Sequence, residues 1–337
     1  MLGALCLIDI IAMNILVTGA SGFIGQRLVN RFVSNGHRIT GSGLSQRAKQ
    51  PPDFTYISAD LALYEPCLKL VEGIDTVVHC AGKAGAWGPK SEYEIANVTA
   101  TMNMLKASRA AGVRRFINLS SASIYFDYKN QFDLKESERA KIFSNAYAET
   151  KFAAEQLVND ANSEKMRTIS LRPRGVVGIG DRAWLPRIIA MRKSGRLIQA
   201  GPGDNLVDFT SVENLVDAIE LCLTTKNENC GKSYNITDGG PERLWDFTEF
   251  ALSLVGLDGK RRRIPTAVAM SAARLVEAYH VVRHSKQEPN ILPIKVGVAA
   301  YSMTLDISAA KKALGYWPKL NSRDSVRQFA EWWKTQV

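Results

Sequence analysis

Short apolar runs alternate with longer amphipathic stretches through the first half of the chain. The apolar runs, rich in Val, Ile, Leu and Phe, predict strands at residues 14–18, 38–42, 54–58, 76–79, 115–119 and 167–171. The stretches between them predict helices at residues 22–34, 65–71, 92–111 and 145–161. Strands and helices in alternation are typical of a parallel sheet that helices cover on both faces. The predicted fold class is therefore α/β, with a doubly wound parallel sheet.

After Pro173 the alternation becomes less regular, because glycines and prolines gather in loops and helical patterns then dominate. We interpret this second half as a smaller, mainly helical substrate-binding domain. The domain limits that follow are 13–173 for the sheet, with a return to it at 205–238, and 174–204 with 239–337 for the smaller domain.

Two apolar segments could be taken for a signal peptide or a membrane-spanning helix. Residues 1–12 lack a basic start and a small-residue cleavage site, so we interpret them as an N-terminal extension before Met13 and not as a signal peptide. Residues 264–282 are apolar, but Arg274 and Glu277 interrupt them, which favours a core or interfacial helix over a membrane span. We expect a cytoplasmic protein with at most peripheral membrane contact.

Composition narrows the range of partners. The 43 Lys and Arg residues outnumber the 33 Asp and Glu residues, and the formal net charge of +10 favours anionic ligands or surfaces. No basic stretch carries interleaved aromatic residues, so nucleic acid is not an expected partner. The densest basic run, residues 260–263, fits either a solvated loop or contact with an anionic membrane surface or ligand. The five cysteines are odd in number and scattered, so we expect no structural disulfide and no metal site.

A glycine-rich loop follows the first predicted strand and opens the first predicted helix. Gly19 permits a tight turn, Gly22 lets the backbone approach a pyrophosphate, and Gly25 allows close helix–strand packing. The anion would lie at the helix amino terminus, where free N–H groups and the helix dipole favour it. This arrangement predicts a Rossmann-type dinucleotide site that also includes Ser21, Phe23 and Ile24.

The end of the second predicted strand bears on the choice of cofactor. An acidic residue usually stands there to hold the ribose 2′-hydroxyl of NAD, but residues 41–47 contain no carboxylate. Ser45 and Arg47 could instead bind a 2′-phosphate. We therefore predict NADP as the preferred cofactor, with NAD as the alternative if Arg47 and Lys49 are only solvated charges.

Tyr147 and Lys151 stand four residues apart in the predicted helix 145–161. They share one helix face, so the ammonium of Lys151 could lower the pKa of the Tyr147 phenol. Such pairs also occur on many surface helices. Together with the glycine loop and the serines at 120–123, however, they make residues 13–337 resemble the extended short-chain dehydrogenase/reductase family.

Within that family the chain is most similar to the branch of 3β-hydroxysteroid dehydrogenases and reductases of long-chain 2-alkyl-3-keto acids. The similarity lies in residues 81–88, 171–181 and 305–318. It implies hydride transfer between NADP(H) and a hydroxyl or keto group of a hydrophobic substrate, sterol-like or a long-chain β-keto acid. Tyr147 would be the general acid/base, Lys151 would stabilise its phenolate, and Ser121 would polarise the substrate oxygen. Strand-end capping is the alternative role for Ser121.

The same resemblance implies further cofactor contacts. Asp60 and Leu61 would lie against the adenine, Ala81 and Gly82 would line the cofactor, and Pro173 would lie beside the nicotinamide. Asn97 either packs the central helix or organises an active-site water. A homodimer through the helices at 92–111 and 145–161 is also implied. His79 lies in an apolar strand, where a histidine is usually packed and hydrogen-bonded, so we assign it no catalytic role.

Two other functions remain open from the sequence. A nucleotide-sugar epimerase or dehydratase would hold NAD and need cations for a diphosphate, for which Arg182, Arg187, Arg192 and Arg196 are available. The missing acidic residue after the second strand argues against it. A non-catalytic dinucleotide-sensing protein could share the fold, but the complete Ser, Tyr and Lys set argues against that function.

Overall fold

The computed structural model describes residues 12–45 and 54–336. Its centre is a seven-stranded sheet in the order β12-β7-β5-β4-β1-β2-β3, with every pair parallel. The strands are β1 (Asn14–Thr18), β2 (Arg38–Gly43), β3 (Phe54–Ser58), β4 (Thr76–His79), β5 (Arg115–Leu119), β7 (Arg167–Pro173) and β12 (Lys232–Ile236). The predicted doubly wound α/β fold is confirmed. The strand order reverses between β1 and β4, and ligands of such sheets bind at the carboxyl ends of the strands there.

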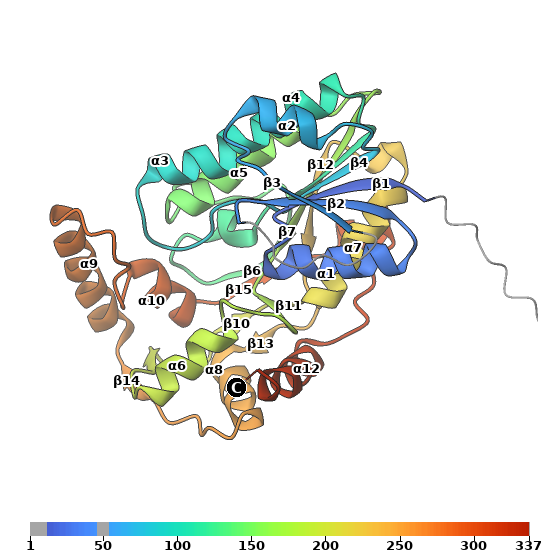
Figure 1. Ribbon diagram of the computed structural model, residues 1–337. Helices are drawn as coiled ribbons and strands as arrows, with labels where there is room; N and C mark the ends of the chain where they lie inside the picture. Colours follow the sequence, from blue (N-terminus) through green and yellow to red (C-terminus); the bar gives the residue numbers. More distant parts are fainter. Residues whose placement is uncertain (1–11, 46–53, 337) are drawn as a thin grey trace, which may run out of the picture.

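Helices cover both faces of the sheet (Figure 1). One face carries α1 (Phe23–Ser34) and α7 (Val212–Thr224), and the other carries α2 (Tyr64–Leu70), α4 (Ala100–Ala110) and α5 (Ala146–Asp160). Successive residues of β1 point to opposite faces, so Ile15 and Val17 enter the first core and Leu16 enters the second. Burial on both faces explains the nearly continuous apolar runs of the strands.

The helix predicted at 92–111 has a more complex form. It begins as α3 (Lys90–Tyr93), continues as a π-helical segment η1 (Glu94–Thr99) and ends as α4. A π segment adds a residue to the helical turn and is frequent at functional sites. Here it carries Asn97, which is buried.

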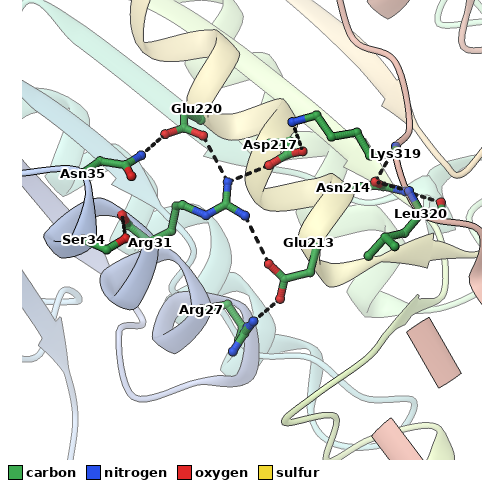
Figure 2. A network of polar contacts seen from close by, with 10 residues as sticks. All are labelled: Arg27, Arg31, Ser34, Asn35, Glu213, Asn214, Asp217, Glu220, Lys319 and Leu320. Carbon is green, nitrogen blue, oxygen red and sulfur yellow. Dashed lines mark hydrogen bonds and ion pairs between the residues drawn. The ribbon is translucent and has the colours of Figure 1, made fainter. Parts of the chain in front are cut away.

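A network of charged side chains joins α1 to α7 on the first face (Figure 2). Arg31 Nη1 lies 2.7 Å from Asp217 Oδ1 and 3.2 Å from Glu220 Oε2, and Arg27 pairs with Glu213. Partly exposed pairs of this kind each contribute at most about 1 kcal/mol, but the shared partners orient the two helices together. The network thereby holds α1 in place beside the glycine loop.

The second half of the chain builds the smaller part of the molecule. A four-stranded sheet has the order β13-β10-β15-β6, and two short parallel pairs, β8 with β11 and β9 with β14, accompany it. The strands are β6 (Gln131–Leu134), β8 (Val176–Val177), β9 (Ile198–Ala200), β10 (Leu206–Val207), β11 (Thr210–Ser211), β13 (Glu242–Arg243), β14 (Arg262–Ile264) and β15 (Met303–Leu305). The helices are α6 (Leu185–Lys193), α8 (Leu244–Leu254), α9 (Thr266–Val282), α10 (Pro293–Ala300), α11 (Ser308–Leu314) and α12 (Ser322–Lys334).

Only part of the segment 205–238, which was predicted to return to the main sheet, does so in the structure. β12 joins the main sheet and α7 packs against it, whereas β10 pairs with β13 and β15 in the smaller sheet. β6, from the first half, also joins the smaller sheet. Its residues were not predicted as a strand, because Gln131 and Asp133 interrupt the apolar pattern. The domain limits themselves stay a prediction.

Candidate active site

The glycine loop forms a tight turn between β1 and α1. Gly19 has φ +68°, and a Cβ there would lie 2.9 Å from the backbone nitrogen of Ala81. A Cβ on Gly25 would collide with the carbonyl oxygen of Gly19, and one on Gly22 would lie 3.1 Å from the same atom. The helix therefore begins directly against the turn, as the predicted roles of Gly19 and Gly25 require.

The amino end of α1 fits the phosphates of a dinucleotide. Gly22 is its N-cap without a side-chain hydrogen bond, and the first turn of this fully described helix has no acidic residue. Its free N–H groups can therefore bind an anion. The Phe23 ring packs 3.3 Å from where a Cβ of Gly180 would stand, and Ser21 Oγ lies 3.0 Å from the corresponding position of Gly43. Ile24 is partly buried against the core of this face.

The end of β2 lies beside this loop. The Tyr56 hydroxyl donates to the carbonyl oxygen of Ser45 at 2.8 Å, which fastens the end of β2 to β3. Arg47, predicted with Ser45 to bind a 2′-phosphate, lies outside the described residues. The predicted adenine contacts follow β3: Asp60 is exposed and accepts from the N–H of Ala62, and Leu61 is buried.

His79 ends β4 and is fully packed. Its Nδ1 lies 2.9 Å from Thr18 Oγ1 and its Nε2 lies 3.0 Å from Thr101 Oγ1. Burial, with a smaller effect of Lys151, lowers the pKa of His79 to about 3. The imidazole is therefore neutral at physiological pH and links β1, β4 and α4.

Asn97 clamps the loop that follows β4. Its Oδ1 accepts from the N–H of Lys83 at 2.7 Å, and its Nδ2 donates to the Lys83 carbonyl and to Thr150 Oγ1. A Cβ on Gly82 would lie 2.8 Å from Asn97 Oδ1 and 3.9 Å from Lys151 Nζ. Of the two roles open from the sequence, the geometry favours the structural one. Asn97 fixes the backbone of Lys83, directly after Gly82, and ties it to Thr150 on α5.

Ser121, Tyr147 and Lys151 converge at the carboxyl end of β5. Asn145 caps α5 by accepting the N–H of Ala148 at 2.9 Å, which places Tyr147 in the first turn and Lys151 in the second. Lys151 Nζ donates to the carbonyl oxygen of Leu119, the last residue of β5, at 2.6 Å. Ser121 Oγ accepts the N–H of Ser123 at 3.1 Å, so the capping alternative for Ser121 is also realised.

The pKa of Tyr147 does not move in the expected direction. Burial raises it, and the nearby Ser121 side chain offsets only part of that rise. The expectation that Lys151 lowers this pKa is wrong for the protein groups by themselves, because burial dominates and the ammonium is bound to Leu119. Burial also lowers the pKa of Lys151 to about 8. These protein groups therefore keep Tyr147 protonated at neutral pH.

A buried ion pair that the sequence did not reveal anchors α5 to β7. Arg172 Nε donates to Glu155 Oε2 at 2.9 Å and Nη2 donates to Oε1 at 2.5 Å, with side-chain exposures of 5% and 0%. Arg172 Nη1 also donates to the Tyr125 hydroxyl, which donates to Asn235 Oδ1 at 2.7 Å. Glu155 lies one turn beyond Lys151, so the pair sets the position of the helix that carries Tyr147.

Arg174, directly after β7, is a cation that forms no ion pair with the described residues, although Asp208 is near enough to influence its pKa. Pro173 is buried, and the register of β5 with β7 places Arg174 about one residue beyond the level of Ser121. Arg174 Nε donates to the Met303 carbonyl at 3.2 Å, and no carboxylate of residues 12–45 and 54–336 lies within ion-pair distance. Burial lowers the pKa of Arg174 to about 10, opposed by Asp208, so it stays charged at neutral pH. Its Nη groups can still bind an anion.

Trp87 connects the loop after β4 to the smaller part of the molecule. Its Nε1 donates to the carbonyl oxygen of Ser285 at 3.0 Å, and its ring meets that of His280 edge-to-face at 6.0 Å. Its own carbonyl oxygen accepts from the Tyr93 hydroxyl at 3.0 Å. The end of α9 is therefore attached to the rim of the site.

Comparison with known proteins places the chain in a family. Residues 15–237 match the NAD dependent epimerase/dehydratase family, and the chain belongs to it. The predicted membership of this superfamily and the predicted class of enzyme, a short-chain dehydrogenase/reductase of the extended type, are confirmed.

Two relatives and one solved structure show the kinds of protein to which the chain is similar. A 2-alkyl-3-oxoalkanoate reductase from Stenotrophomonas maltophilia is 31% identical, over 94% of this chain and 98% of the relative. A decarboxylating sterol-4-alpha-carboxylate 3-dehydrogenase from Mus musculus is 29% identical, over 93% of this chain and 88% of the relative. The structure of UDP-glucuronic acid 4-epimerase from Bacillus cereus with NAD has a TM-score of 0.76 at 21% identity, over 96% of this chain and 99% of that one, which shows a shared fold.

Proposed function

We propose that this protein is an NADP(H)-dependent oxidoreductase that interconverts a keto and a hydroxyl group on a hydrophobic β-keto or β-hydroxy acid. The observation that carries the proposal is the meeting of Ser121, Tyr147 and Lys151 at the end of β5: Lys151 Nζ donates to the Leu119 carbonyl oxygen at 2.6 Å, and Tyr147 lies one turn before Lys151 on α5, near enough to Ser121 for that side chain to lower its pKa. This places a proton donor and a polarising hydroxyl at the strand ends where such sheets bind ligands.

The proton transfer would belong to Tyr147. When bound, the nicotinamide supplies or accepts the hydride. In reduction the Tyr147 phenol donates its proton to the substrate oxygen, while the Ser121 hydroxyl orients that oxygen. A raised pKa keeps the phenol in the protonated form that reduction requires. In oxidation Tyr147 must first lose this proton, and Lys151 is the nearest cation on its helix.

The substrate class rests on Arg174 and on the two relatives. The names of both relatives describe an acid whose carboxylate is borne by the carbon next to the one that carries the reacting oxygen. Arg174 supplies, at the corresponding end of the sheet, a charge that forms no ion pair with residues 12–45 or 54–336. Charge-assisted hydrogen bonds to a carboxylate are the interaction that a guanidinium forms best. We assign Arg174 to that carboxylate.

The preference for NADP rests on the end of β2, where residues 41–45 supply no carboxylate to repel a 2′-phosphate. The test uses purified protein, NADPH or NADH, and a panel of 2-alkyl-3-oxo acids and nucleotide sugars. We expect the absorbance of the reduced nicotinamide to fall when a 2-alkyl-3-oxo acid is added, and to fall faster with NADPH than with NADH. Tightly bound NAD with turnover of a nucleotide sugar would overturn the proposal in favour of an epimerase, and cofactor binding without any turnover would favour a sensor.

A further inference from the structure

Helix α9 buries very little of its surface. Within this fully described helix, only Ala269, Met270 and Ala273 are buried. Its outward surface is almost wholly apolar, since Ser271 and Arg274 are the only polar residues among its exposed positions. The exposed large apolar residues are Val268, Leu275, Tyr279, Val281 and Val282.

The apolar residues form a continuous stripe. Val268, Leu275, Tyr279 and Val282 are spaced by seven, four and three residues, which places them on one helix face. Leu275 is 72% exposed and Val282 is 79% exposed. In Figure 1, α9 lies at the edge of the molecule, far from the seven-stranded sheet. A contiguous apolar face of this kind usually marks an interaction surface.

Basic residues flank the stripe at both ends. Arg262 and Arg263 precede α9, and Arg283, His284 and Lys286 follow it, all of them exposed. The nearby acids do not balance this charge. Glu277 is half-buried beside Arg274, and Glu288 is paired with Lys295 and Arg187.

We propose that α9 docks the protein on a membrane surface that contains anionic lipids. An apolar stripe with cations at its borders is the pattern of a helix that lies in the plane of such an interface. A second copy of the chain fits less well, because a two-fold contact of α9 with itself would bring the cations of one end toward those of the other. None of the described helices is long and apolar enough to cross a bilayer.

Docking would also place the rim of the candidate active site at the lipid surface. Trp87 joins the loop after β4 to the end of α9 through Ser285 and His280. An apolar substrate could then pass between the membrane and the site. The docking itself does not depend on the proposed function, since it can be measured without turnover.

The first experiment is sedimentation of the full-length protein with vesicles. We expect binding to vesicles of phosphatidylcholine with phosphatidylglycerol, little binding to phosphatidylcholine alone, and weaker binding at high salt. The double variant Leu275→Glu/Val282→Glu should bind more than about 100-fold more weakly, because it removes two apolar side chains that docking would bury in the membrane and adds charges that anionic lipids repel. The matched control, Ile142→Glu/Leu63→Glu, changes exposed apolar residues elsewhere and should bind normally.

The second experiment separates charge from apolar contact. The variant Arg283→Ala/Lys286→Ala should bind roughly 30-fold more weakly, since each cation near an anionic surface contributes about 1 kcal/mol, or about a fivefold factor in affinity. Its control, Lys106→Ala/Lys165→Ala, removes two exposed lysines, one on α4 and one between α5 and β7, and should bind as the unchanged protein does. Unchanged thermal midpoints show that the variants are folded.

The proposal is overturned if the unchanged protein does not bind anionic vesicles. It is also overturned if Leu275→Glu/Val282→Glu binds as well as its control, or if that variant dissociates a dimer while the unchanged protein ignores vesicles. None of these outcomes depends on cofactor oxidation. The vesicle experiments would therefore still test membrane docking if the proposed enzymatic function proved wrong.

Discussion

The buried pair of Arg172 and Glu155 gives a prediction that links the fold to the candidate site. Glu155→Gln would replace the bidentate carboxylate partner of the buried Arg172 guanidinium with a neutral amide. Breaking a buried pair by neutralising one member costs about 3–5 kcal/mol, because a charge is left uncompensated in the interior. The side-chain exposures of 5% and 0% place this pair in that class.

The assay is the free energy of unfolding from urea titration followed by circular dichroism. Glu149→Gln is a matched control on the same helix, because Glu149 pairs with the exposed Lys90 and its loss should change stability little. The double variant Arg172→Met/Glu155→Leu should regain most of the lost stability, since it removes both charges together. If Glu155→Gln lowers the free energy of unfolding no more than Glu149→Gln does, the ion pair of Arg172 and Glu155 does not anchor α5.

Three further predictions concern the site. Tyr147→Phe should abolish turnover and leave NADPH affinity nearly unchanged, because it removes only a proton donor; steady-state kinetics with fluorescence binding would check this, and retained turnover would contradict the assigned role. The pKa of His79 is about 3 in the folded protein and about 6.5 in the unfolded chain. The contribution of neutral His79 to the free energy of unfolding is therefore fully present above pH ~6.5 and is lost as the pH falls toward about 3. At pH 5 the loss should be about 2 kcal/mol relative to His79→Gln, and equal pH slopes for both proteins would refute it. Arg174→Met should lower kcat/KM for a 2-alkyl-3-oxo acid roughly 10- to 150-fold but leave its methyl ester nearly unaffected; Arg182→Met is the control, and equal losses for acid and ester would remove the carboxylate assignment.

The first half of the fold was predictable because its signals are local. Several strands of the main sheet, such as β1 and β4, are short apolar runs, and the turn at Gly19 requires a backbone conformation that glycine adopts easily. The helical spacing of Tyr147 and Lys151 likewise follows from 3.6 residues per turn. Burial on both sheet faces made these patterns strong.

Other features depend on which segments meet. β6 has a mixed polar pattern and becomes a strand only through pairing with β15. Arg172 finds Glu155, and Asn97 finds Lys83, through contacts between elements that are distant in the sequence. No local period encodes such partners.

The sequence alone determined the dinucleotide fold, its glycine loop and the set of Ser121, Tyr147 and Lys151, because each is written in residue type and spacing. Only the tertiary structure decided that Tyr147 has a raised pKa, that Arg174 forms no ion pair with the described residues and that α9 presents its apolar face outward. The physical reason is that burial, and with it desolvation and pairing, is a property of the assembled fold and not of the chain.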